Sequence, residues 1–254
     1  MHRAKTLVVL AGTILLLASC SSAITSRPSD TATATAPASS PASSPIASLP
    51  FNSSGLLGGT AQPSLPDGDP GEVSVVQVGP LDVQRGTLVF AFRNNTSETI
   101  SHVDWTATAR SGGSIVGTGS SQGTTPSWVA PGEVGLAYIY FETAAQIPDG
   151  TEYEFAVGSS PADTTSYNTA PLKVTESNLI GTSIVGGAIN DTGADATGPF
   201  SVSIYCFDGD NLTGETGGFG EQDDAAADAA VSFSVDLYDT VCATYALGVS
   251  GYFS

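Results

Sequence analysis

The chain has 254 residues and a formal net charge of −18, because 25 acidic residues outnumber seven basic ones. Such a charge argues against direct binding to nucleic acid or to anionic lipid headgroups. The length is enough for one large domain or two small ones.

The first twenty residues have the pattern of an export signal. Arg3 and Lys5 form a basic start, residues 7–18 are mostly apolar, and Cys20 follows. An apolar run of about twelve residues suits a signal peptide and is too short to span a membrane. The stretch Leu17-Ala18-Ser19-Cys20 resembles the bacterial lipobox, which implies removal of residues 1–19 and a diacylglycerol group on the Cys20 thiol. The alternative is an ordinary secretory signal whose cleavage zone contains a cysteine.

A lipid at Cys20 would fix the location of the protein. Its two acyl chains would supply the two hydrophobic anchors that stable membrane attachment needs. No later stretch of the sequence is long and apolar enough to span a bilayer. We therefore expect a cell-membrane protein that is lipid-anchored on the extracytoplasmic face.

The cysteine count agrees with this prediction. The chain has three cysteines, Cys20, Cys206 and Cys242, and an odd number is awkward for an exported protein. If Cys20 carries lipid, the other two can pair in a compartment that permits disulfides. We predict a Cys206–Cys242 bridge, which would stabilise the fold by about 3 to 4 kcal/mol on the chain-entropy model.

Residues 20–70 are predicted to form a disordered tether. In residues 21–50, 25 of 30 residues are Ser, Thr, Ala or Pro, and no periodicity is visible. Such a composition cannot bury enough apolar area to offset the entropy of ordering. The pattern continues less purely to Pro70, with Gly and Pro at intervals, and the alternative is that Phe51, Leu56 and Leu57 dock on the rest of the chain. We expect this tether to hold the rest of the chain away from the membrane.

The remaining residues contain a faint internal repeat. In each half a strand-like run is followed by an alternating run and then by an Asn-x-Thr turn, at residues 94–96 and 190–192. A second alternating strand and a Gly-containing turn follow in both halves, and two further runs end each half. About six short strands per half, with period-two alternation, predict a small β-sandwich at residues 71–160 and another at residues 165–254.

The second half resembles a known family. Three segments together are similar to the FxLYD domain of prokaryotic surface proteins. The central segment is Ile204-Tyr205-Cys206-Phe207-Asp208-Gly209-Asp210; Asn190-Asp191-Thr192-Gly193 precedes it, and Val249-Ser250-Gly251-Tyr252 follows it near the end of the chain. The match lies in pattern and spacing more than in identity, since only the Asp of the name motif is retained. It covers roughly residues 172–254, with a weaker echo in 73–158. The resemblance implies an immunoglobulin-like β-sandwich and a surface location, and it implies no catalytic residues. The expected fold is therefore all-β, with two tandem immunoglobulin-like β-sandwich domains.

Strand parity places a condition on the disulfide. Cys206 has the parity of Ile204 and should face the core, whereas Cys242 has the opposite parity from Ala243 and Tyr245. A bulge, or a strand that starts late after Thr240, would bring the two sulfur atoms together.

The sequence offers little for catalysis. After residue 19 it has one histidine, His102, so sites with paired histidines are excluded, and Asp104 points to the same polar face of the strand. We interpret this pair as solvated surface residues and expect no enzyme activity and no cofactor. A hydrolase that uses His102 is retained as a third hypothesis.

The acidic loops of the second half are candidates for a metal site. Asp208, Asp210, Glu221, Asp223 and Asp224 carry the hard oxygen ligands that calcium prefers. Read as an EF-hand loop from Asp208, the sixth position is Thr213 where glycine belongs, so that motif fails. The alternative is a hairpin turn beside a solvated acidic loop.

The two tryptophans receive different predictions. Trp105 shares parity with Val103 and Ala107, so we expect it in a core. Trp128 lies in a loop between two prolines and is a weak candidate for an exposed binding contact.

These patterns favour a non-enzymatic interaction or spacer module, anchored to the membrane, whose partner is an unknown envelope protein or surface ligand. The alternative is a lipoprotein that binds a divalent cation such as calcium, or a small solute, through the acidic loops.

Overall fold

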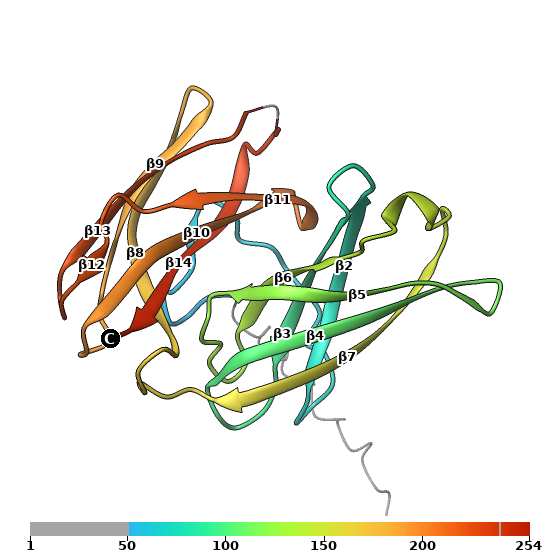
Figure 1. Ribbon diagram of the computed structural model, residues 1–254, viewed down its shortest axis with the longest axis horizontal. Helices are drawn as coiled ribbons and strands as arrows, with labels where there is room; N and C mark the ends of the chain where they lie inside the picture. The colour runs from blue at the N-terminus through green and yellow to red at the C-terminus, as the bar shows by residue number, and fades with distance from the viewer. Residues whose placement is uncertain (1–50, 239) are drawn as a thin grey trace, which may run out of the picture. The chain divides into compact units, whose positions relative to one another are not determined.

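The computed structural model describes residues 51–238 and 240–254 (Figure 1). The signal peptide, Cys20 and residues 20–50 of the predicted tether lie outside the described residues. The described part is all-β apart from one turn of 3₁₀ helix, η1 (Ala144–Gln146), so the predicted all-β class is confirmed.

The strands form two antiparallel sheets. The first sheet contains β2 (Val73–Asp82), β3 (Thr87–Asn94), β4 (Ile100–Ser111), β5 (Ser114–Thr125), β6 (Val134–Tyr140) and β7 (Glu152–Pro161). The second sheet contains β8 (Thr169–Ile180), β9 (Ser183–Ile189), β10 (Ala196–Asp208), β11 (Asn211–Phe219), β13 (Ala230–Asp236) and β14 (Thr244–Phe253), with the two-residue strands β1 (Gly58–Gly59) and β12 (Asp224–Ala225).

Strand pairing recurs between the two sheets. The pairs β2–β3, β3–β6, β4–β5 and β4–β7 of the first sheet have counterparts in β8–β9, β9–β13, β10–β11 and β10–β14. The register agrees at the level of single residues. Ala109 pairs with Gly117 and Tyr153, immediately before a bulge, and Cys206 pairs with Gly214 and Tyr245, also before a bulge. The faint repeat in the sequence therefore has a structural counterpart.

Each sheet is curled, and strand pairing closes the two sheets at different edges. In the first sheet β5 pairs with β6, while the described strands leave β2 and β7 unpaired with each other. In the second sheet β8 pairs with β14 through residues 169–172 and with β9 through residues 173–180. Its edge strands β11 and β13 approach at one isolated bridge beyond the end of β11, between Gly220 and Phe233.

A buried asparagine stabilises the same corner in both sheets. The side-chain amide of Asn94 donates hydrogen bonds to the carbonyls of Glu98 and Val129, and its oxygen accepts one from the Thr96 hydroxyl at 2.7 Å. Asn190 makes the equivalent bonds to Ala194, Ala225 and Thr192. Both asparagines are fully buried, and their amides are satisfied by these backbone carbonyls.

Alternation produces a core in each sheet, as predicted. On β4 the side chains of Val103, Trp105, Ala107 and Ala109 are buried, and Trp105 lies 5.3 Å from the ring centroids of Phe90 and Phe92. On β10 the side chains of Phe200, Val202, Ile204 and Cys206 are buried and pack in the core of the second sheet.

Residues 51–70, here called the strap, correct the predicted limit of the tether. Leu57, Ala61 and Leu65 are buried in a third apolar cluster, together with residues of both sheets. Gly59 pairs with Ala246 of β14 so closely that a Cβ there would lie 2.2 Å from the Tyr245 carbonyl oxygen. The strap is thus an ordered part of the fold, because a few well-spaced apolar residues and a glycine suffice to dock it.

Candidate functional site

Two buried charged side chains hold the strap. The Arg93 guanidinium donates to the carbonyls of Pro66 at 3.1 Å, Leu65 at 3.3 Å and Gly132 at 2.6 Å. Burial lowers the pKa of Arg93 from its ordinary value. A guanidinium titrates far above neutral pH, so it stays charged and its bonds to the carbonyls are charge-assisted.

The neighbouring Glu133 carboxylate holds the beginning of the strap. One of its oxygens accepts hydrogen bonds from the backbone amides of Ser53 and Ser54 and from the Ser53 hydroxyl at 2.7 Å. Glu133 is only 2% exposed, and these bonds compensate the cost of burying a carboxylate.

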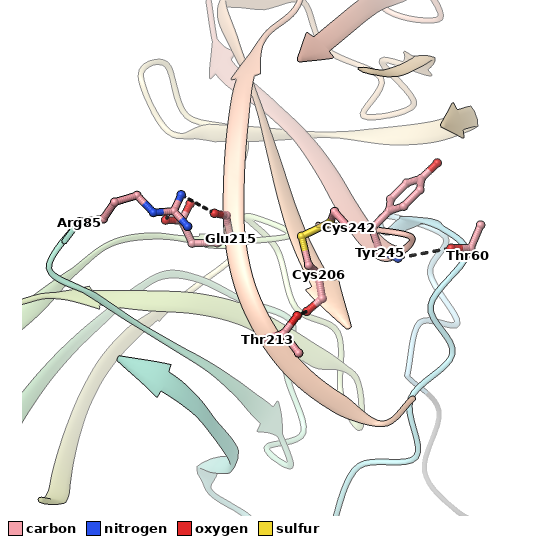
Figure 2. The surroundings of a disulfide bond; sticks show 7 residues. All are labelled: Thr60, Arg85, Cys206, Thr213, Glu215, Cys242 and Tyr245. Carbon is pink, nitrogen blue, oxygen red and sulfur yellow. Dashed lines mark hydrogen bonds and ion pairs between the residues drawn. A yellow bond between two sulfur atoms is a disulfide. The ribbon is translucent and has the colours of Figure 1, made fainter. Parts of the chain in front are cut away.

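The predicted disulfide joins Cys206 on β10 to Cys242, with 5.0 Å between the Cα atoms (Figure 2). Cys242 precedes β14, which starts at Thr244, so the late strand start required by parity is present. The Tyr245 amide donates to the Thr60 hydroxyl of the strap at 3.3 Å, and the Thr213 hydroxyl donates to the Cys206 carbonyl at 3.0 Å. The bridge therefore lies beside the point where the strap meets β14.

A polar contact links the sheets on the other side of β10. Arg85, in the turn after β2, donates to the Glu215 carbonyl at 2.7 Å and lies 3.7 Å from its carboxylate (Figure 2). Burial raises the pKa of Glu215, and the charge of Arg85 opposes that rise. Burial also raises the pKa values of Tyr138 and Tyr205, which lie near the same carboxylate.

A cavity of about 560 Å³ lies where the two sheets meet. Its second-sheet side is formed by Thr169 of β8 and by outward-facing positions of β10 and β14, including Ser201, Ser203 and Tyr205, which alternate with the core residues of β10. Ser201 pairs directly with Ser250 of β14, so two hydroxyl-bearing residues lie side by side.

The first-sheet side of the cavity is formed where two strands lose their regular ladder. β4 has a bulge between Ser101 and Asp104, where His102 adopts a φ of 46°, and β5 has one between Ser121 and Thr124. The Ser121 hydroxyl accepts a hydrogen bond from the Trp105 amide at 3.0 Å, which ties the two irregular segments together. Bulges of this kind redirect side chains and are frequent beside binding sites.

The structure places His102 and Asp104 at this cavity. Both side chains are exposed, as predicted, and both line its first-sheet side. The Ser101 hydroxyl lies 3.1 Å from His102 Nδ1. We predicted that these two residues are solvated surface residues. The sequence could not show that the second sheet lies opposite them and makes their surface one wall of a cavity.

The acidic candidates are separated. Asp208 and Asp210 lie at the β10–β11 turn, whereas Glu221, Asp223 and Asp224 follow the far end of β11, a strand of nine residues and hence about 30 Å long. Asp210 accepts a hydrogen bond from the Ser64 amide of the strap at 2.8 Å, and Asp224 accepts one from the Thr197 hydroxyl at 2.8 Å. Among residues 51–238 and 240–254, no group of three or more His, Cys, Asp or Glu residues has the geometry to hold a metal ion.

Trp128 is half-buried and packs against the core of the second sheet. Its ring centroid lies 5.8 Å from that of Phe253, and its neighbours include Pro171 and the strap residue Leu56. This loop tryptophan therefore makes a packing contact between the sheets, whereas the sequence made it a weak candidate for an exposed binding contact.

Sequence reasoning did not identify the cavity. Its lining is rich in serine and threonine, scattered over six strands and the loop after β5. The sequence shows only that every second residue of β10 and β14 is polar. This alternation looks the same whether the polar side chains face solvent or face a second sheet.

In comparisons with models of protein families, with curated proteins and with solved structures, nothing matches this chain. The resemblance to the FxLYD family therefore rests on the residue pattern alone. Within the described residues, no helix has the length and apolar character to cross a membrane.

Proposed function

We propose that this protein is a cell-surface lipoprotein, anchored to the membrane through Cys20, that acts as a non-enzymatic interaction or spacer module. The observation that carries the proposal is the division of the three cysteines. Cys206 and Cys242 are bonded to each other, so neither is available to Cys20, which follows Leu17-Ala18-Ser19 at the end of an export signal. A lipidated Cys20 accounts for the odd cysteine.

We further propose that the two curled sheets are tandem immunoglobulin-like β-sandwich domains and that the second is a member of the FxLYD family. The recurring strand pairs, the matching bulges at Ala109 and Cys206, and the paired asparagine corners support a duplicated domain. The motif residues Ile204 to Asp210 occupy the end of β10 and its turn, where the family pattern requires a strand entering a turn.

The strap determines how such a module would act. Because residues 51–70 are docked on both sheets, a tether anchored at Cys20 would pull on the folded body through the strap. The body would then be held at a fixed attachment point, which suits a protein that presents one surface away from the membrane. A solute-binding role through the acidic loops is less well supported, because those loops are separated.

Metabolic labelling with an alkyne palmitate analogue tests the anchor. We expect the wild-type protein to incorporate the label and to sediment with membranes, and Cys20→Ala to lose the label and to appear in the soluble extracytoplasmic fraction. The double variant Cys206→Ala, Cys242→Ala is the matched control and should keep the label. An unlabelled wild-type protein, or a labelled Cys20→Ala variant, would contradict the proposal.

A further inference from the structure

The cavity between the sheets has a lining of unusual chemical uniformity. Of its sixteen lining residues, eight are serine or threonine and three are tyrosine. The others include one carboxylate, Asp104, one imidazole, His102, and one amide, Gln122, and none is lysine or arginine. Nearly every polar group that faces this cavity can therefore both donate and accept a hydrogen bond.

We propose that this cavity is a binding site for a neutral, polyhydroxylated ligand, that is, a saccharide. A sugar hydroxyl also both donates and accepts hydrogen bonds. Hydroxyl groups in the cavity wall can therefore accept from it or donate to it, and no charge is left unpaired. The assignment goes beyond the lipid anchor and does not depend on it.

The lining disfavours the other ligand classes. An anion needs cationic partners, and the lining provides no lysine or arginine in a strongly acidic chain. A calcium ion needs six to eight oxygen ligands, usually with several carboxylates, and Asp104 is the one carboxylate in the lining. An apolar ligand would leave the hydroxyl groups of Ser201, Ser203 and their neighbours unsatisfied.

Tyrosine rings complete the chemistry that a sugar requires. Tyr252 on β14 is 43% exposed and borders the cavity together with Tyr138 of β6. A tyrosine presents an apolar ring face together with a polar hydroxyl, which suits a ligand whose rings have both C–H faces and O–H edges. A volume of about 560 Å³ lies within the range of about 300–1,000 Å³ that is typical of small-molecule sites.

The walls are held in place before any ligand binds. Tyr205 and Thr125 are both buried, and Gly248 of β14 lets the Thr125 methyl group approach, since a Cβ there would lie 2.6 Å from it. Because the two sheets supply opposite walls, a bound ligand would contact both and would stabilise their association.

The full-length protein can be titrated with neutral trisaccharides of glucose, mannose, galactose, arabinose and N-acetylglucosamine, by calorimetry and by thermal denaturation. We expect at least one trisaccharide to bind at millimolar concentration or below and to raise the melting temperature. Failure of all five to bind at millimolar concentration overturns the proposal, as does binding of calcium alone at this site.

Variants of the facing serines locate the binding. Ser201→Val with Ser250→Val removes two hydroxyls from the cavity and should weaken binding by about tenfold or more. Ser234→Val, on the exposed face of β13, is the matched control and should bind as the wild type does. The melting temperatures of the unliganded variants monitor folding. Equal affinity of a folded Ser201→Val, Ser250→Val variant and the wild type would place the ligand elsewhere and contradict the assignment.

Discussion

The two sheets share their strand connectivity and differ in how they close. The first sheet is sealed by the β5–β6 ladder and is open between β2 and β7 within the described residues. The second is closed by the pairing of β8 with β14, while the residue after β11, Gly220, forms one bridge to Phe233 in the middle of β13. The same strand connectivity is therefore closed at different edges in the two sheets.

The means of stabilisation differ in the same way. The first sheet has a cluster of aromatic rings, with Trp105 within about 6 Å of Phe90, Phe92 and Phe155. The second sheet has a covalent bridge from Cys206, at the position where the first sheet has Ala109. The first sheet thus has no disulfide at this position, and we expect its ring cluster to contribute a comparable share of its stability.

Trp105→Ala should have the largest effect. Removing a buried indole from this cluster leaves a cavity, and such truncations cost about 3–5 kcal/mol in the free energy of unfolding. Chemical denaturation measures the loss. Ile115→Ala, at a side chain 58% exposed on β5, is the control and should change stability by less than about 0.5 kcal/mol. A loss for Trp105→Ala below about 1 kcal/mol would show that the rings do not stabilise the first sheet.

The double variant Cys206→Ala, Cys242→Ala should come next. The bridge closes a sequence separation of 36 residues, for which the chain-entropy model gives about 4 kcal/mol. Hydrogen exchange should show that β10 and β14 lose protection before β3 and β4, if the bridge serves the second sheet alone. A uniform loss of protection would instead show that the two sheets unfold as one unit.

The asparagine corners test the parts that the sheets have in common. Asn94→Ala and Asn190→Ala each remove at least two side-chain hydrogen bonds to backbone carbonyls at a buried corner, so each should cost about 2 kcal/mol. Asn178→Ala, at an exposed position on β8, is the control and should have little effect. Denaturation curves that give clearly unequal costs for the two corners would argue against their structural equivalence.

Much of each sheet could be predicted from the sequence because the signals are local. Alternation along β4 and β10 indicates which side chains are buried, and the Asn-x-Thr spacing marks both corners. The parity of Cys242 required a late strand start, and β14 begins at Thr244. All these signals depend on residues within one strand or turn.

The strap and the cavity could not be predicted, because both depend on residues far apart in the sequence. Leu57 and Leu65 stand in a stretch rich in glycine and proline, and the side chains that hold the strap, Arg93 and Glu133, are at least 27 residues away. Ser201 and Ser203 have the parity of solvent-facing residues, and only the docking of the first sheet turns that face into a cavity wall.

Glu133→Gln should have a smaller effect, localised to the strap. The amide keeps an oxygen that can accept from Ser53 and Ser54 but loses the charge, which should cost about 1 kcal/mol. Limited proteolysis should then cleave within residues 51–70 faster than in the wild type, with both sheets intact. Glu142→Gln, at an exposed position, is the control. Unchanged cleavage in Glu133→Gln would mean that apolar burial alone holds the strap.

Glu215→Gln should have the smallest effect on the free energy of unfolding, and this effect should depend on pH. Burial raises the pKa of Glu215 above its ordinary value of 4.5, so the unfolded chain releases this proton at a lower pH than the folded protein does. The contribution of this group to stability therefore falls as the pH rises from about 4.5 through the folded-state pKa, and it is constant above that. The neutral glutamine has no such dependence.

The free energy of unfolding of Glu215→Gln relative to wild type should consequently increase as the pH rises through this window. The variant also loses the charge contact with Arg85, which lowers its free energy of unfolding at every pH where Glu215 is ionised in the wild type. Added salt should make this loss smaller, because Arg85 is partly exposed and its charge is screened. Glu142→Gln should give a difference that stays flat over the same pH range. A difference for Glu215→Gln that falls with pH would mean that attraction to Arg85 outweighs burial at this contact between the sheets.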